Sequence, residues 1–264
     1  MSTQIISYKE IFELTIRRLN RLKEISIKKN NILTKEDEFL FLLMGNMNLR
    51  LNTIFLLLEH NNTDGVLPLQ RTIFELNLAF QVYINSDDKE KFLSLYSAKR
   101  NFESAVKWDK LMASDSNQLF SAREKEAIND FKNNYMNEVK NYTKMQPFKL
   151  WYELASNQSL KQLSDEYFND LDYFVNYDEP SNWVHPQRLE KNLTTDLKAY
   201  LPDEYKQLLI GTLYWNLRYL SKNIEYIAKH LNICTSPPLV AYGKKVELFS
   251  NSLINLFKTS SNNK

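Results

Sequence analysis

The sequence contains little of three residue types on which several classes of protein depend. Its 264 residues include one cysteine, Cys234, which excludes an intramolecular disulfide and a zinc site built on several thiolates. Only 4 glycines and 7 prolines are present, too few for the turns of a many-stranded sheet or for a glycine-rich phosphate loop. With three histidines, His60, His185 and His230, a multi-histidine metal centre is not expected. We therefore expect no metal and no cofactor.

The chain also lacks a strong net charge and a long uninterrupted apolar run. Its 34 basic and 32 acidic residues give a net charge of +2, which provides no overall field to attract nucleic acid or an anionic membrane. The longest apolar stretch, 39–58, is interrupted by Asn46, Asn48, Arg50 and Asn52. These residues are costly in lipid but tolerable inside a helical bundle. No signal sequence is expected, and we predict a cytoplasmic protein that does not enter a membrane.

Helical periodicity is what the sequence does contain. Hydrophobic residues make up 43% and aromatic residues 13% of the chain, enough to build a sizeable core. Apolar residues recur every three or four positions along most of the chain, with polar residues between them. The predicted helices are 8–29, 34–60, 66 to the break at 86–88, 89–112, 122–142, 150–155, 159–177, 202–231 and 240–257.

These helices predict an all-α fold, a single multi-helix bundle with a long antiparallel helical hairpin at its centre. The hairpin consists of the second and third helices, joined by the turn 61–65. Residues 1–264 are expected to form one domain, with 114–157 as a peripheral insertion or cap and 259–264 as a disordered tail. Pro180 and Pro186 should allow at most one helical turn between them.

A charged pair lies in the most apolar of the predicted helices. Arg71 and Glu75 are one turn apart in a segment that is apolar nearly all round, so neither side chain can easily reach water. Counting outward from the turn places Asn52 opposite Glu75. Arg71 could clamp a phosphate or stabilise a developing oxyanion, because its guanidinium presents a rigid fork of donors. The alternative is a structural ion pair with Glu75 and Asn52.

A second polar ladder follows about a hundred residues later. Tyr173, Tyr177, Ser181 and His185 recur every four residues, and Pro186 follows the last of them. His185 is the best candidate for proton transfer at cellular pH. Its alternative role is that of a hydrogen-bonded buried histidine that holds a loop. Tyr177 and Ser181 could orient His185 or hold a ligand, or they could cap a short turn between the two prolines.

Together the two elements resemble those of an uncharacterised bacterial all-helical family, a domain of unknown function. Its members share an Arg-x-x-x-Glu helix and a downstream Tyr-x-x-x-Ser-x-x-x-His element, and the resemblance covers roughly residues 35–230. More distantly, the chain resembles the HEPN helical bundles, many of which are metal-independent ribonucleases in toxin or antiphage systems. The HEPN pattern places an arginine four to six residues before a histidine on one helix. No arginine stands at that distance before any histidine of this chain.

The resemblance implies a bacterial defence or toxin-like protein that cleaves RNA without a metal. His185 would then act as the general acid and base, Arg71 would stabilise charge on the phosphate, and Glu75, Tyr177 and Ser181 would orient them. Tyr173 and Asn52 complete the predicted ligand contacts. Two other hypotheses remain open. In one, the same polar pocket belongs to a non-enzymatic sensor of a protein trigger or small ligand. In the other, the polar residues are structural locks in a homo-oligomeric bundle.

Overall fold

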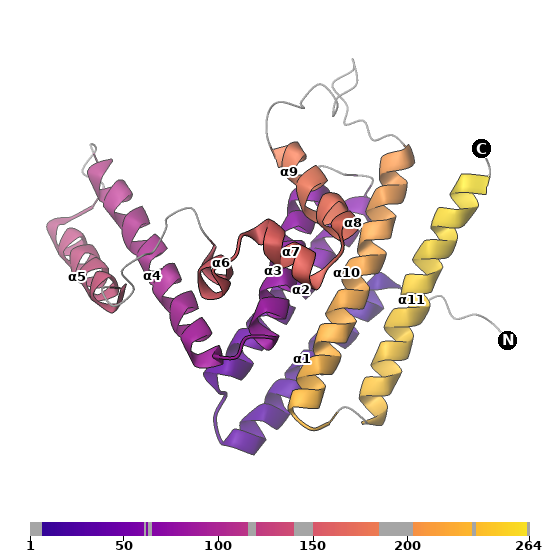
Figure 1. Cartoon of the computed structure of the whole chain (residues 1–264), viewed down its shortest axis with the longest axis horizontal. Helices are drawn as coiled ribbons and strands as arrows, with labels where there is room; N and C mark the ends of the chain where they lie inside the picture. The colour runs from indigo at the N-terminus through magenta and orange to yellow at the C-terminus, as the bar shows by residue number, and fades with distance from the viewer. Residues whose placement is uncertain are drawn as a thin grey trace, which may run out of the picture. The chain divides into compact units, whose positions relative to one another are not determined.

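A computed structural model of the chain describes residues 7–60, 62, 65–115, 120–139, 150–184, 203–233 and 236–262 (Figure 1). Every regular element in these ranges is helical, which confirms the predicted all-α fold. The elements are α1 (Tyr8–Asn30), α2 (Lys35–Glu59), α3 (Val66–Ile84), α4 (Lys89–Ala113), α5 (Ala122–Val139), α6 (Trp151–Ser156), α7 (Leu160–Tyr167), α8 (Asp170–Tyr173), the π-helical turn η1 (Phe174–Asp178), α9 (Glu179–Val184), α10 (Asp203–His230) and α11 (Pro237–Asn262). The central antiparallel hairpin stays a prediction.

Local sequence sets many of the helix ends. The Thr34 hydroxyl accepts a hydrogen bond from the backbone N–H of Asp37 at 3.1 Å and so caps α2, as its sequence predicts. Asparagine follows three of the helices: Asn31, Asn157 and Asn232 adopt left-handed φ angles of 63°, 58° and 63°. Among residues other than glycine, asparagine is one of those best tolerated there. Three helix ends are thus formed without glycine.

Some predicted helix boundaries are wrong. The expected helix 159–177 is broken, because α7 ends at Tyr167 and a new helix starts at Asp170. Asn169 causes this restart: its side-chain oxygen accepts a hydrogen bond from the Asp172 backbone N–H at 2.8 Å. At the other end of the chain, α11 continues to Asn262, past residue 259 where we expected a disordered tail. No glycine or proline interrupts residues 244–262.

The chain divides into two compact units. Unit 1 comprises residues 1–80 and 164–264, and unit 2 comprises residues 81–163. The divisions fall inside α3 and inside α7. Unit 2 includes the range 114–157, which we predicted to be a peripheral insertion or cap of a single domain. That description of the domain organisation stays a prediction.

In unit 1, α10 packs against α1, α2 and α11, and α1 packs against α2 and α11. Figure 1 shows α10 and α11 running side by side. The core contains leucine, isoleucine, methionine and aromatic side chains from these helices. One buried amide also joins them: the Asn223 side chain of α10 donates to the Asn77 side-chain oxygen of α3 at 2.8 Å and lies 4.0 Å from the Met47 sulfur of α2. Burial of such a group requires hydrogen-bond partners, so this contact restricts how the three helices can pack.

In unit 2, α4 packs against α5 and α6. An aromatic cluster surrounds Trp151 of α6, whose ring centre lies 5.0 Å from that of Phe92 and 4.9 Å from that of Tyr96. Both contacts are edge-on, a favoured geometry for aromatic pairs. Packing within unit 2 therefore accounts for the surroundings of Trp151, and no ligand is needed to explain its position.

Within the described residues, α2 is the one helix long and apolar enough to cross a membrane. Core helices of soluble proteins can have the same length and composition; 39% of the most apolar stretch of α2 is buried, and α2 packs against α1 and α10 in unit 1. The expectations that the chain is cytoplasmic and does not enter a membrane stay predictions.

The buried phenol of Tyr242 should make the fold sensitive to high pH. Burial raises the pKa of Tyr242 to about 12, while the nearby Thr15 hydroxyl, 3.0 Å away, and Arg18 oppose the rise. The fold favours the neutral phenol, so this stability is present below about pH 10 and is lost as the pH rises towards 12. Between about pH 9 and 11, the wild type should lose roughly 1 kcal/mol more free energy of unfolding than Tyr242→Phe. Urea unfolding at both pH values measures this difference, and equal losses would contradict it.

Candidate functional site

The two predicted polar elements both lie in unit 1, and the structure brings them together. Arg71 of α3 donates a hydrogen bond from Nη2 to the Tyr177 hydroxyl at 3.2 Å. Its guanidinium carbon also lies 4.8 Å from the centre of the Tyr177 ring, within range of a cation–π contact. On the same helix, Arg71 Nε lies 3.3 Å from a carboxylate oxygen of Glu75. Arg71, Glu75 and Tyr177 therefore form one cluster.

The Arg71–Glu75 pair is less buried than its sequence suggested. The exposed fractions of the two side chains are 31% and 24%, so our expectation that neither could easily reach water is wrong. Periodicity identifies the neighbours of a residue along its helix but not how completely other elements cover it. The contact between Nε and the carboxylate is ionic rather than a well-aligned hydrogen bond. Solvent reduces the energy of such a pair, and although Nε itself is buried, part of the Arg71 side chain stays in contact with water.

Aromatic rings hold Tyr177 against α3. The Phe74 ring centre lies 6.0 Å from that of Tyr177, 6.4 Å from that of Tyr173 and 5.3 Å from that of Phe168. Tyr173 and Tyr177 are themselves 5.4 Å apart. Phe74 follows Arg71 by three residues and so lies on a neighbouring part of the same helix face. Packing on Phe74 thus positions the Tyr177 hydroxyl beside the guanidinium.

Tyr177 lies in a π-helical turn inside a continuous helical run of α8, η1 and α9. The Glu179 N–H donates to the carbonyl of Phe174, five residues back. The next bond of this kind would run from residue 180 to Val175, but Pro180 has no N–H to donate. The Gln70 side chain of α3 donates to that carbonyl instead, at 3.3 Å. π-turns of this type are frequent at functional sites.

Gln70 makes a second and shorter contact with the same turn. Its Nε2 donates to the side-chain oxygen of Asn176 at 2.8 Å, and the side chains of both residues are buried. Asn176 in turn donates to the Asp172 backbone carbonyl at 2.9 Å. We expected the helix to end near Tyr177, whereas α9 continues through Pro180 to Val184. Pro180 falls in the first turn of α9, and Gln70 supplies the donor that the proline lacks.

Two further contacts fix the surroundings of Tyr177. The Ser181 hydroxyl donates to the backbone carbonyl of Tyr177 at 2.5 Å, so this serine supports the turn. The Tyr219 hydroxyl of α10 donates to an Asp172 carboxylate oxygen at 3.2 Å. Burial, and then the negative charge of Asp172, raise the pKa of Tyr219 above its usual value. The phenol of Tyr219 therefore stays a neutral donor at cellular pH.

Sequence reasoning missed Gln70, Asn176, Asp172 and Tyr219. A signal for the first two was present, since Gln70 is a polar residue in an apolar helix and Asn176 stands between two aromatic ladder positions. Of the predicted residues, His185 lies outside the described residues. Asn52 is half-buried on α2, and its contact with Glu75 stays a prediction. Among the described side chains, no cluster of three or more His, Cys, Asp or Glu could hold a metal ion.

The Gln70–Asn176 hydrogen bond should be visible as a coupling energy. Gln70→Leu leaves the Asn176 oxygen and the Val175 carbonyl without their donor, which should cost about 1–3 kcal/mol of stability. Asn176→Leu should cost a similar amount. If the two side chains stabilise the turn together, the double variant loses less free energy of unfolding than the two single variants lose in sum. The difference should be at least about 0.5 kcal/mol. Urea unfolding followed by circular dichroism measures all four proteins, and strictly additive losses would refute the coupling.

Comparison with known proteins places these residues in a family. The model of a family of unknown function, DUF5677, matches residues 37–199, which is more than half of the chain. The matched range contains α3, η1 and every predicted site residue. Searches of curated proteins and of solved structures find no match. The chain therefore belongs to the DUF5677 family, whose function is unknown, as the resemblance of its two polar elements predicted.

Proposed function

We propose that this protein binds RNA at Arg71 and Tyr177 and cleaves it without a metal, as a toxin-like or antiphage protein of the bacterial cytoplasm. Arg71 binds the phosphate that reacts, and His185 transfers the protons. Tyr177 and Glu75 orient Arg71. Ser181 supports the turn that carries Tyr177, eight residues before His185.

The observation that carries this proposal is that Arg71 is both held and accessible. Its guanidinium is positioned by Tyr177 on one side and Glu75 on the other, yet 31% of the side chain is exposed. A structural ion pair that only seals a core would be covered. A positioned guanidinium can bind a phosphate with little further ordering, which is the requirement for stabilising charge in a transition state.

The proposed reaction uses the 2′-hydroxyl of the RNA as its nucleophile. A neutral His185 takes the 2′-hydroxyl proton as the 2′-oxygen attacks the adjacent phosphorus. The bond from phosphorus to the 5′-oxygen then breaks, and the leaving oxygen receives a proton from the imidazolium. The products are a 2′,3′-cyclic phosphate and a 5′-hydroxyl end. Arg71 stabilises the added negative charge on the phosphate oxygens, and no metal is needed.

A second candidate function is binding without cleavage. The observation that favours it is that Arg71 already has two partners in its own chain. An anionic ligand would compete with Glu75 for the guanidinium, so ligand binding could be coupled to a change at η1 through Tyr177. The same residues would then form the sensor of a protein trigger or small ligand.

A cleavage assay with matched variants tests the proposal. The substrate is a 5′-labelled single-stranded RNA in the presence of EDTA, and the proteins are the wild type, Arg71→Ala, His185→Ala and Arg218→Ala. Arg218 is the matched control, because it donates to the Tyr214 hydroxyl at 2.5 Å and lies 5.4 Å from that ring, an arginine–tyrosine pair outside the cluster. We expect Arg71→Ala and His185→Ala to lower the rate at least about 100-fold, and Arg218→Ala to lower it less than about threefold.

The outcomes of this assay separate the two functions. RNA carrying 2′-O-methyl groups should resist the wild type, because its nucleophile is blocked. If the wild type binds the modified RNA, Arg71→Ala weakens that binding, and the unmodified RNA is not cleaved, the protein is a binding module and not a ribonuclease. Neither binding nor cleavage by folded wild type, as confirmed by circular dichroism, would overturn both functions for RNA.

A further inference from the structure

A stripe of exposed leucines follows the outer side of α2. Leu42, Leu49 and Leu56 are 51%, 57% and 45% exposed, and successive members are seven residues apart. This spacing is that of one seam position in a coiled coil, so the three side chains lie along one line of the helix. Isolated exposed leucines are ordinary, but an aligned series of them marks an interaction surface. The stripe is separate from the buried face of α2 in the core of unit 1.

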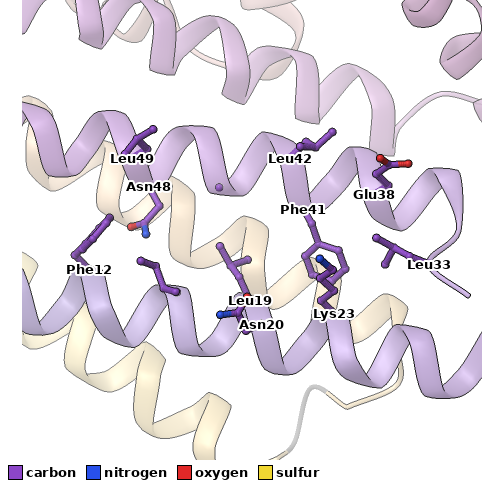
Figure 2. A pocket seen from close by; sticks show the side chains of 12 residues that line it. Phe12, Leu19, Asn20, Lys23, Leu33, Glu38, Phe41, Leu42, Asn48 and Leu49 are labelled. Carbon is purple, nitrogen blue, oxygen red and sulfur yellow. The ribbon is translucent and has the colours of Figure 1, made fainter.

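A groove of about 490 Å³ between α1 and α2 adjoins this stripe. Figure 2 shows side chains from both helices around it, with Phe12 and Leu19 on α1 and Leu42 and Leu49 on α2. Gly45 lies between the two leucines, and a Cβ atom added there would meet no other atom within 4 Å. Within a helix, glycine is less favourable than alanine by about 1 kcal/mol. Gly45 leaves space for a neighbouring helix to approach closely.

The stripe is symmetric about Leu49. Leu42 and Leu56 stand seven residues before and after Leu49, and Asn46 and Asn52 stand three before and after it. Two copies of such a helix that pair antiparallel about a two-fold axis at Leu49 place each leucine opposite a leucine and each asparagine opposite an asparagine. A surface with this property is self-complementary, as the interface of a two-fold dimer must be.

Charges at the two ends of α2 favour the same pairing. Lys35 and Glu38 begin the stripe, and Glu59 and His60 end it, and all four side chains are exposed. An antiparallel pair about Leu49 places Lys35 one helical turn from Glu59 of the second copy, and Glu38 opposite His60 of the second copy, whose ring can donate a hydrogen bond to the carboxylate. A parallel pair would instead place like residues together at both ends. Electrostatic complementarity therefore selects the antiparallel arrangement.

We propose that the outer face of α2 is the interface of a homodimer, in which two α2 helices pair antiparallel about Leu49. A lipid surface fits this face less well, because Asn46, Arg50 and Asn52 adjoin the leucines. Arg50 Nη1 donates to the Asn46 side-chain oxygen at 2.8 Å, which places a charged group beside the stripe. The proposal is independent of the proposed ribonuclease activity.

Sedimentation velocity of the full chain tests the interface. The wild type should be a dimer at about 100 µM, and Leu49→Lys should weaken dimerisation at least about 100-fold, because it places two positive charges at the two-fold axis. Leu248→Lys is the matched control: Leu248 is an equally exposed leucine on α11, and its substitution should leave the dimer intact. Circular dichroism confirms that each variant is folded.

Cross-linking tests the position of the axis. In a Cys234→Ser background, Leu49→Cys should form a disulfide-linked dimer on mild oxidation, since each residue 49 meets its own copy. Leu42→Cys should not, because Leu42 faces Leu56 of the second copy. A monomeric wild type, a dimer unaffected by Leu49→Lys, or cross-linking of Leu42→Cys but not Leu49→Cys would each overturn the proposal. A monomer that binds lipid vesicles only with Leu49 intact would assign this face to a membrane instead.

Discussion

The candidate site depends on one constraint, the carbonyl of Val175 that Pro180 leaves without a backbone donor. Gln70 satisfies this carbonyl from α3, and the same amide nitrogen binds Asn176. A half-buried carbonyl without a donor would cost up to about 1–3 kcal/mol, so the π-turn and α3 stabilise each other. Residue 71 follows Gln70 directly, and Tyr177 follows Asn176 directly. The hydrogen bond that maintains the turn therefore also brings Arg71 beside Tyr177.

The cluster around Arg71 combines a structural and a functional requirement. Phe74, Tyr173 and Tyr177 form a rigid aromatic layer, and Arg71 lies against Tyr177 with part of its side chain in water. Full burial of the Arg71–Glu75 pair would incur a large desolvation penalty, whereas partial exposure reduces that penalty. An arginine in this position is held in one orientation by its contacts while part of its side chain stays in contact with water. That combination suits the binding of a phosphate more than the locking of a core.

The helices of this chain could be predicted from sequence because their determinants are local. Thr34 caps α2 as its flanking residues indicate, and the apolar spacing identifies most of the other helices to within a few residues, the region 159–184 excepted. The helix at Pro180 could not be predicted, because the donor that replaces the proline N–H is the Gln70 side chain, 105 residues before the Val175 carbonyl that accepts from it. The sequence likewise pointed to Arg71 and Tyr177 as polar residues in apolar surroundings. It could not reveal that they touch, since no local pattern encodes a contact between residues 106 positions apart.

One arrangement, the proposed pairing of two α2 helices, explains both the apolar character of α2 and the symmetric spacing of its leucines. A helix at the surface of a monomer has one apolar face, and the opposite face is polar. α2 buries one face against α1 and α10 and carries a second apolar line at Leu42, Leu49 and Leu56, which is why it also passes a length and composition test for membrane spans. A membrane would require the polar residues between these leucines to contact lipid. The proposed pairing of two α2 helices instead covers the leucines and sets the asparagines opposite those of the second copy, so it accounts for both the apolar and the polar residues of this face.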